Sequence, residues 1–172
     1  PVINGIMDRF HRIVATQDWH PKHHASFASN HPGKKPFEQI DLGGVSQTLW
    51  PDHCVAGTGG AEFHPGLNPD RFDLIVRKGT NPAVDSYSAF LENDKKTKTG
   101  LDGYLMSIGA GRVFFCGLAT DYCVFYSVMD AVSFGFTTLV ILDACRGIDV
   151  PGGSIERSIS DMKRKGVRII ES

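Results

Sequence analysis

The sequence has little of what several specialised protein classes require. It contains no apolar run near the ~20 residues that a bilayer-spanning helix needs, and no basic segment followed by an apolar signal core at its start. We therefore expect no membrane partner and a cytoplasmic location. Its four cysteines are too few for a disulfide scaffold, and no two form a Cys-x-x-Cys pair. We expect free thiols whose roles must be decided one by one.

An excess of charge of either sign is also absent. Eighteen Lys and Arg face nineteen Asp and Glu, which gives a formal net charge of −1. A balanced charge provides no broad basic surface of the kind that binds nucleic acid. We expect a small-molecule substrate as the partner and leave open a homo-oligomer of this chain.

Short apolar segments alternate with helix-like segments along the chain. Continuous apolar runs without polar alternation are typical of buried parallel strands, and we expect such strands at 13–15, 74–76, 113–116, 139–142 and 167–170. Apolar stripes at helical spacing predict helices near residues 3–10, from Thr120 or Asp121 as the cap to Gly135, and over 154–164 with Ser154 as the cap. The pattern predicts an α/β fold: one domain over residues 1–172 with a mostly parallel sheet that helices cover on both faces.

The segment 18–72 is rich in His, Pro and Gly with little periodicity, and a bound metal would explain an ordered excursion of this length. Asp18 and His20 directly follow a predicted strand, at the edge where α/β sheets place ligands. His53 is a candidate third ligand, and four other histidines compete for that role: His23, His24, His31 and His64. For an isolated pair, a capping Asp and a surface His would be the commoner interpretation.

Cys123 lies in the segment 117–124 (GLATDYCV), which predicts a turn from a strand into a helix. In the first turn of a helix, the dipole and the free amides favour thiolate over thiol and can bind an oxyanion. The alternative is a small buried residue, an interpretation that we keep for Cys54, Cys116 and Cys145. Lys78 follows the predicted strand 74–76, so its ammonium is expected at the same sheet edge; a salt-bridged surface lysine is the alternative.

Five strings together resemble the nicotinamidase and pyrazinamidase branch of the isochorismatase-like cysteine hydrolases. They occur in family order and extend over nearly the whole chain: ATQDWHP (15–21), SFA (26–28), WPDHCV (50–55), KG (78–79) with DSYSAF (85–90), and GLATDYCV (117–124). Five strings in order are far more specific than any one of them.

The resemblance implies a reaction and the residues that carry it out. Cys123 would attack the carboxamide carbon of nicotinamide, and Lys78 would match the catalytic lysine. The amides of Ala119 and Cys123 would form an oxyanion hole, beside a cis peptide bond between Leu118 and Ala119. Loss of ammonia would leave a thioester, which water hydrolyses to nicotinate. Pyrazinamide is expected to react as well.

The resemblance also implies a doubly wound, three-layer fold, a cofactor and a pocket. Asp18, His20 and His53 would hold one divalent metal ion, with zinc expected first and iron or manganese as alternatives. Aromatic side chains would line the substrate pocket: Trp50, Tyr87, Phe27 and Tyr122. Asp121 is interpreted as a capping and turn residue rather than as a general base.

One element of the family pattern is missing from this sequence. No segment matches the first strand, which ends in a catalytic Asp and would lie between the strands at 13–15 and 113–116. Asp8 lies on a helical stripe and is not assigned this role. We expect a gap in the sheet, a monomer of low stability, and a natural chain with an N-terminal segment before Pro1. Two other functions therefore stay open: a metal- and ligand-binding protein without catalysis, and a sibling hydrolase with another small amide substrate.

Overall fold

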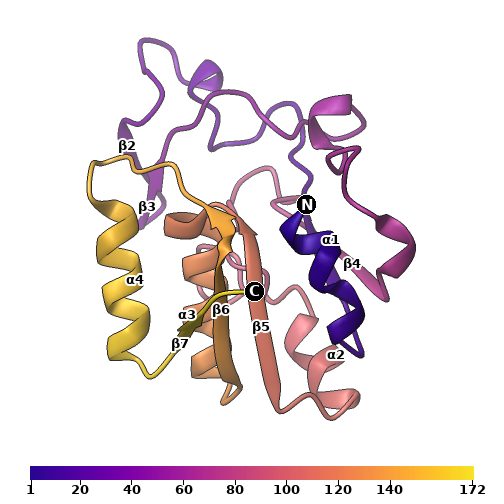
Figure 1. Cartoon of the computed structure of the whole chain (residues 1–172). Coiled ribbons are helices and arrows are strands. Elements are labelled where there is room, and N and C mark those ends of the chain that lie inside the picture. Colours follow the sequence, from indigo (N-terminus) through magenta and orange to yellow (C-terminus); the bar gives the residue numbers. More distant parts are fainter.

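The computed structural model describes all 172 residues, and its strands and helices alternate as an α/β fold requires (Figure 1). All five predicted strands are present. The strands are β1 (Val14–Asp18), β2 (Gln39–Leu42), β3 (Val45–Thr48), β4 (Leu74–Lys78), β5 (Arg112–Leu118), β6 (Thr137–Arg146) and β7 (Arg168–Ile170). The helices are α1 (Val2–Ile6), α2 (Leu101–Ser107), α3 (Phe125–Ser133) and α4 (Ser154–Arg164), with 3-10 turns at Met7–Arg9, Ala28–Asn30, Gly59–Ala61 and Pro69–Arg71 and a π-helical turn at Thr120–Val124.

The parallel strands form two separate sheets, β1-β4 and β5-β6-β7. In the first sheet Asp18 is the register partner of Lys78, and in the second β5 pairs with both halves of β6 across an irregularity after Phe115. No backbone ladder connects the two sheets, so the expected gap in the sheet is confirmed. The remaining pair, β2 and β3, is an antiparallel hairpin within the segment 18–72.

Side-chain packing joins the two sheets where the backbone does not. One apolar cluster is built around Phe90, Leu101 and Leu105, and residues of both sheets pack against it, among them Val76 and Phe115. A second cluster packs α3 and α4 on β6. In Figure 1, α1 lies in front of the sheet on the opposite side from α3, so helices cover both faces of the β5-β6-β7 sheet.

The expectation of continuously buried strands is confirmed for β6 but wrong for the other parallel strands, each of which includes an exposed residue. Four successive residues of β6 are buried, whereas β4 alternates and leaves Ile75 47% exposed. Cys116 is exposed although it lies inside β5. The reason is local: the Phe10 ring covers Phe114 at a centroid distance of 5.1 Å, but this cover ends before Cys116.

The expected side-chain caps are also wrong. Thr120 and Asp121 make no capping hydrogen bond, because the chain forms the π-helical turn first and α3 begins at Phe125. The Asp121 carboxylate instead accepts hydrogen bonds from the backbone amides of residues 148 and 149 and from Ser154 Oγ. Ser154 is the first residue of α4, and the N-cap residue of this helix is Gly153. No helix combines the length and the apolar character that crossing a bilayer requires.

Candidate active site and metal centre

The site lies where three parallel strands end. Asp18 closes β1, Lys78 closes β4, and Cys123 follows β5 in the π-helical turn. Because the carboxyl ends of parallel strands share one edge of an α/β fold, three residues that are far apart in the sequence converge. The peptide bond between Leu118 and Ala119 at this edge is cis, as expected.

Lys78 connects the other two residues. Its side chain is 3% exposed, and its Nζ donates to Asp18 Oδ1 at 2.6 Å, to the Ser86 carbonyl at 2.7 Å and to Cys123 Sγ at 3.3 Å. Burial lowers the pKa of Lys78, but the neighbouring Cys123 and Asp18 raise it more, so that the net pKa lies above the usual range. A buried ammonium therefore persists beside the sulfur.

Cys123 is half-buried. Burial raises the pKa of the Cys123 thiol, and the Lys78 ammonium, which donates to its sulfur, partly opposes this. The net direction of the pKa is therefore opposite to the bias toward thiolate that a helix start was expected to provide. Lys78 is a neighbour that favours the thiolate.

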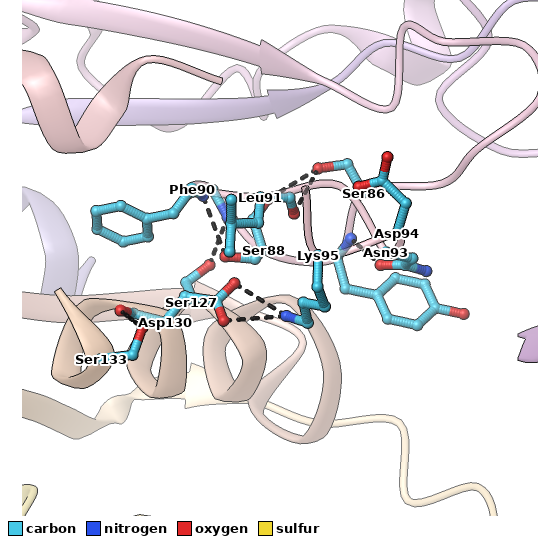
Figure 2. Close-up of polar contacts among 12 residues, drawn as sticks. Ser86, Ser88, Phe90, Leu91, Asn93, Asp94, Lys95, Ser127, Asp130 and Ser133 are labelled. Atoms are coloured by element: carbon cyan, nitrogen blue, oxygen red, sulfur yellow. Dashed lines mark hydrogen bonds and ion pairs between the residues drawn. The ribbon is translucent and has the colours of Figure 1, made fainter. Parts of the chain in front are cut away.

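A loop over residues 85–93 contacts Lys78 through Ser86 and α3 through Ala89, and Figure 2 shows this loop beside Ser127 of α3. Ser86 provides the carbonyl that accepts from Lys78. Three residues further on, the Ala89 amide donates to Ser127 Oγ at 2.9 Å, and Ser127 Oγ in turn donates to the Cys123 carbonyl at 2.6 Å. Sequence reasoning missed this serine, because a Ser in the middle of a helix carries no distinctive signal.

Three candidate metal ligands come together. One donor atom each from Asp18, His20 and His53 lies within 4.8 Å of the others. The Nδ1 atoms of His20 and His53 lie 2.9 Å from the carbonyls of Gly79 and Pro51, respectively. Because a carbonyl only accepts, both Nδ1 atoms carry the proton and both Nε2 atoms present a lone pair. This arrangement is typical of zinc-ligating histidines.

His20 is held by a close backbone approach. Gly79 has a φ of +65°, and a Cβ at this position would lie 2.3 Å from the Cε1 atom of His20. Burial lowers the pKa of His20, which keeps the imidazole neutral and able to ligate. The two imidazoles and the carboxylate therefore fit a divalent metal ion.

The competing histidines have other partners. His31 Nε2 lies 2.8 Å from the Ala25 carbonyl, His64 Nδ1 accepts from the Gly66 amide, and His23 is exposed. Only His24 packs against the metal ligands, with its ring centroid 4.4 Å from that of His20. Asp8, which we did not assign as a general base, is 89% exposed and pairs with Arg71.

The predicted pocket aromatics separate into two groups. Trp50, Tyr87 and Tyr122 form one cluster with edge-to-face contacts, in which the Trp50 and Tyr122 centroids are 4.7 Å apart. Trp50 Nε1 donates to the Tyr87 hydroxyl at 3.1 Å. Phe27 has no accessible surface and packs edge-on against His20 and His53, so it supports the ligands from behind.

Comparison with known proteins agrees with this geometry. The family model for the isochorismatase domain matches residues 10–172. A nicotinamidase of Acinetobacter baylyi is 49% identical over 172 residues, which are all of this chain and 80% of that protein. The solved structure of an Acinetobacter baumanii nicotinamidase and pyrazinamidase has a TM-score of 0.97 and 53% identity, and the match covers 99% of this chain and 82% of that one. A pyrazinamidase of Pyrococcus horikoshii in complex with zinc has a TM-score of 0.76 and 34% identity, with 99% and 80% covered.

Proposed function

The chain belongs to the isochorismatase domain family, and from this membership and its similarity to nicotinamidases we propose that it hydrolyses nicotinamide to nicotinate and ammonia. The observation that carries the proposal is the contact between Cys123 Sγ and the buried Lys78 Nζ, beside a carboxylate of the candidate metal set. One domain over residues 1–172 carries the reaction.

Cys123 is the proposed nucleophile. Its sulfur forms a bond to the carboxamide carbon, the carbon–nitrogen bond breaks, and ammonia leaves with the proton of the thiol. A water molecule then hydrolyses the thioester, which returns the thiol and releases the acid. The Lys78 ammonium stabilises the negative charge on the sulfur, and in this role it is a proposed catalytic residue.

The proposed oxyanion hole consists of the backbone amides of Ala119 and Cys123. No backbone or side-chain hydrogen bond engages the Ala119 amide in the structure, which leaves it free to donate to the oxygen of the tetrahedral intermediate. A free amide beside the nucleophile supports this assignment.

Asp18, His20 and His53 would hold one divalent ion, and zinc suits their two nitrogens and one carboxylate best. When bound, the ion supplies a Lewis acid at the site. The protein positions it through the Gly79 and Pro51 carbonyls, which fix the two imidazoles. Iron and manganese remain alternative ions.

Trp50, Tyr87 and Tyr122 would select a flat aromatic substrate by ring packing. On this basis we propose that pyrazinamide is also hydrolysed, since it has the same shape. The cytoplasmic location and a homo-oligomer stay predictions.

Ammonia release from nicotinamide tests the proposal. Wild-type protein is expected to release ammonia, whereas Cys123→Ala should release none and keep the wild-type metal content. The matched control is Cys116→Ala, which removes an exposed thiol outside the site and should leave the rate unchanged. Turnover by Cys123→Ala would contradict the nucleophile assignment. An inactive wild-type protein that still binds nicotinamide would favour the non-catalytic binder, and activity on another small amide only would favour a sibling hydrolase.

A further inference from the structure

A second group of ligand-type side chains lies behind the first. One donor atom each from His20, His24 and Asp85 lies within 4.8 Å of the others, and all three residues are at most 4% exposed. No hydrogen bond or ion pair joins any two of them directly. The three donors therefore lie close to one another without bonding to each other.

His24 is the unusual member of this group. It has no accessible surface, and its Nδ1 lies 2.7 Å from Ser26 Oγ. Its Nε2 is the one buried side-chain nitrogen or oxygen in the chain without a hydrogen-bond partner. An unsatisfied buried polar atom costs about 1–3 kcal/mol, so an atom in this position indicates a partner that the protein alone does not supply.

Asp85 provides the opposite charge. Its oxygens accept from the Ser86 amide at 2.7 Å and from Gln47 Nε2 at 3.1 Å, but no cationic group pairs with it directly. A buried carboxylate that lacks a cationic partner is costly, and a bound cation removes that cost. Two imidazoles and one carboxylate are also a ligand set that suits zinc.

We propose that His20, His24 and Asp85 form an inner cation position for a transition-metal dication such as Zn²⁺, next to the outer set of Asp18, His20 and His53. The two positions share His20. Because His20 Nδ1 is committed to the Gly79 carbonyl, only one nitrogen of this ring is free to ligate. One lone pair binds one ion, so the two positions are alternatives and a chain holds a single ion in either one.

The two positions differ in access. Asp18 has a side chain that is 23% exposed, whereas the inner ligands are closed off from solvent. An ion in the inner position is screened from substrate, and an ion in the outer position is not. An ion in the inner position is thus bound by the protein but does not contact the substrate.

Cobalt binding tests this inference without reference to catalysis. The protein is stripped with a chelator and dialysed against Co²⁺, whose visible absorption bands report the ligand set. Wild type is expected to bind one ion. His53→Ala should still bind one ion, with shifted bands and an affinity about 10- to 100-fold weaker. Adding His24→Ala to His53→Ala should abolish the binding that remains.

Two further variants guard against misfolding. Asp85→Asn in the His53→Ala background keeps the side-chain volume and should also abolish the remaining binding, while circular dichroism checks the fold. His31→Ala, which removes a histidine outside both sets, serves as the matched control and should leave the His53→Ala result unchanged. If His53→Ala binds no cobalt, or if its binding survives both added substitutions, the inner position does not exist. Because the readout is metal binding, an inactive enzyme neither supports nor contradicts it.

Discussion

Replacing Lys78 by Met removes the ammonium beside Cys123 and keeps an unbranched side chain that is one atom shorter. The Nζ to Sγ distance is 3.3 Å. At an effective dielectric constant near 20, two unit charges at this distance attract each other by about 5 kcal/mol. Water that enters where the ammonium was reduces the effect on the sulfur. We expect the rate constant for alkylation of Cys123 by iodoacetamide near pH 7 to fall by at least ~100-fold, because the thiolate reacts and the thiol does not.

Peptide mapping by mass spectrometry separates Cys123 from the other three thiols in this assay. The variant also leaves Asp18 without its cation, which destabilises the fold by about 3–5 kcal/mol, so circular dichroism must show that it is folded at the assay temperature. The matched control is Lys95→Met: Lys95 also pairs with a carboxylate, Asp130, but its side chain is 47% exposed and its Nζ bonds to Asp130 and not to Cys123. An alkylation rate in folded Lys78→Met within twofold of the control would refute the electrostatic argument.

Two other substitutions test the frame of the site. Gly79→Ala should weaken Zn²⁺ binding about 10- to 100-fold, because the new Cβ displaces His20. The control is Gly57→Ala, which introduces the same positive-φ strain but has nothing within 4 Å of its Cβ, and it should leave Zn²⁺ binding unchanged. An equal loss of Zn²⁺ binding in both variants would contradict the steric argument. Asp121→Asn should lower the free energy of unfolding at neutral pH by about 1–3 kcal/mol for each hydrogen bond lost. Burial raises the pKa of Asp121, but the bonds from Ser154 and the backbone outweigh it and the net pKa is lowered. The stabilisation is therefore present above the usual Asp pKa of ~3.9 and disappears as the pH falls through the lower folded-state value. Urea titrations from pH 7 to pH 2.5 should show the two proteins converging in acid, and a constant difference would contradict the assignment.

Much of the fold could be predicted because the parallel strands are local apolar runs. The hairpin of β2 and β3 was missed, although the pair Gly43 and Gly44, with φ values of 63° and 89°, forms the two-residue turn that joins the strands. Its flanking strands are largely polar, so alternation gave little signal. Helix α2 was missed as well, since it is only seven residues long and contains Gly103.

Within the site, the sequence indicated residue types and sheet edges but not partners. Lys78 and Cys123 could be placed at one edge because each follows a strand. The bond from Ser127 to the Cys123 carbonyl could not be predicted, because it depends on a π-helical turn that residue patterns do not encode. His24 was one of four equal competitors in the sequence, and its burial, its packing against His20 and its unpartnered Nε2 set it apart.

The division of the parallel strands into two sheets has a consequence for how the enzyme loses activity. Lys78 belongs to one sheet and Cys123 follows the other, so their contact crosses a seam that apolar packing and a few side-chain hydrogen bonds hold together without a backbone ladder. Such packing permits small slippage that a hydrogen-bonded ladder would resist. A displacement of about one ångström along the seam separates ammonium from sulfur beyond hydrogen-bond range while each half keeps its own secondary structure. Mild heat or dilute denaturant should thus lower the reactivity of the Cys123 thiol well before circular dichroism shows a loss of secondary structure.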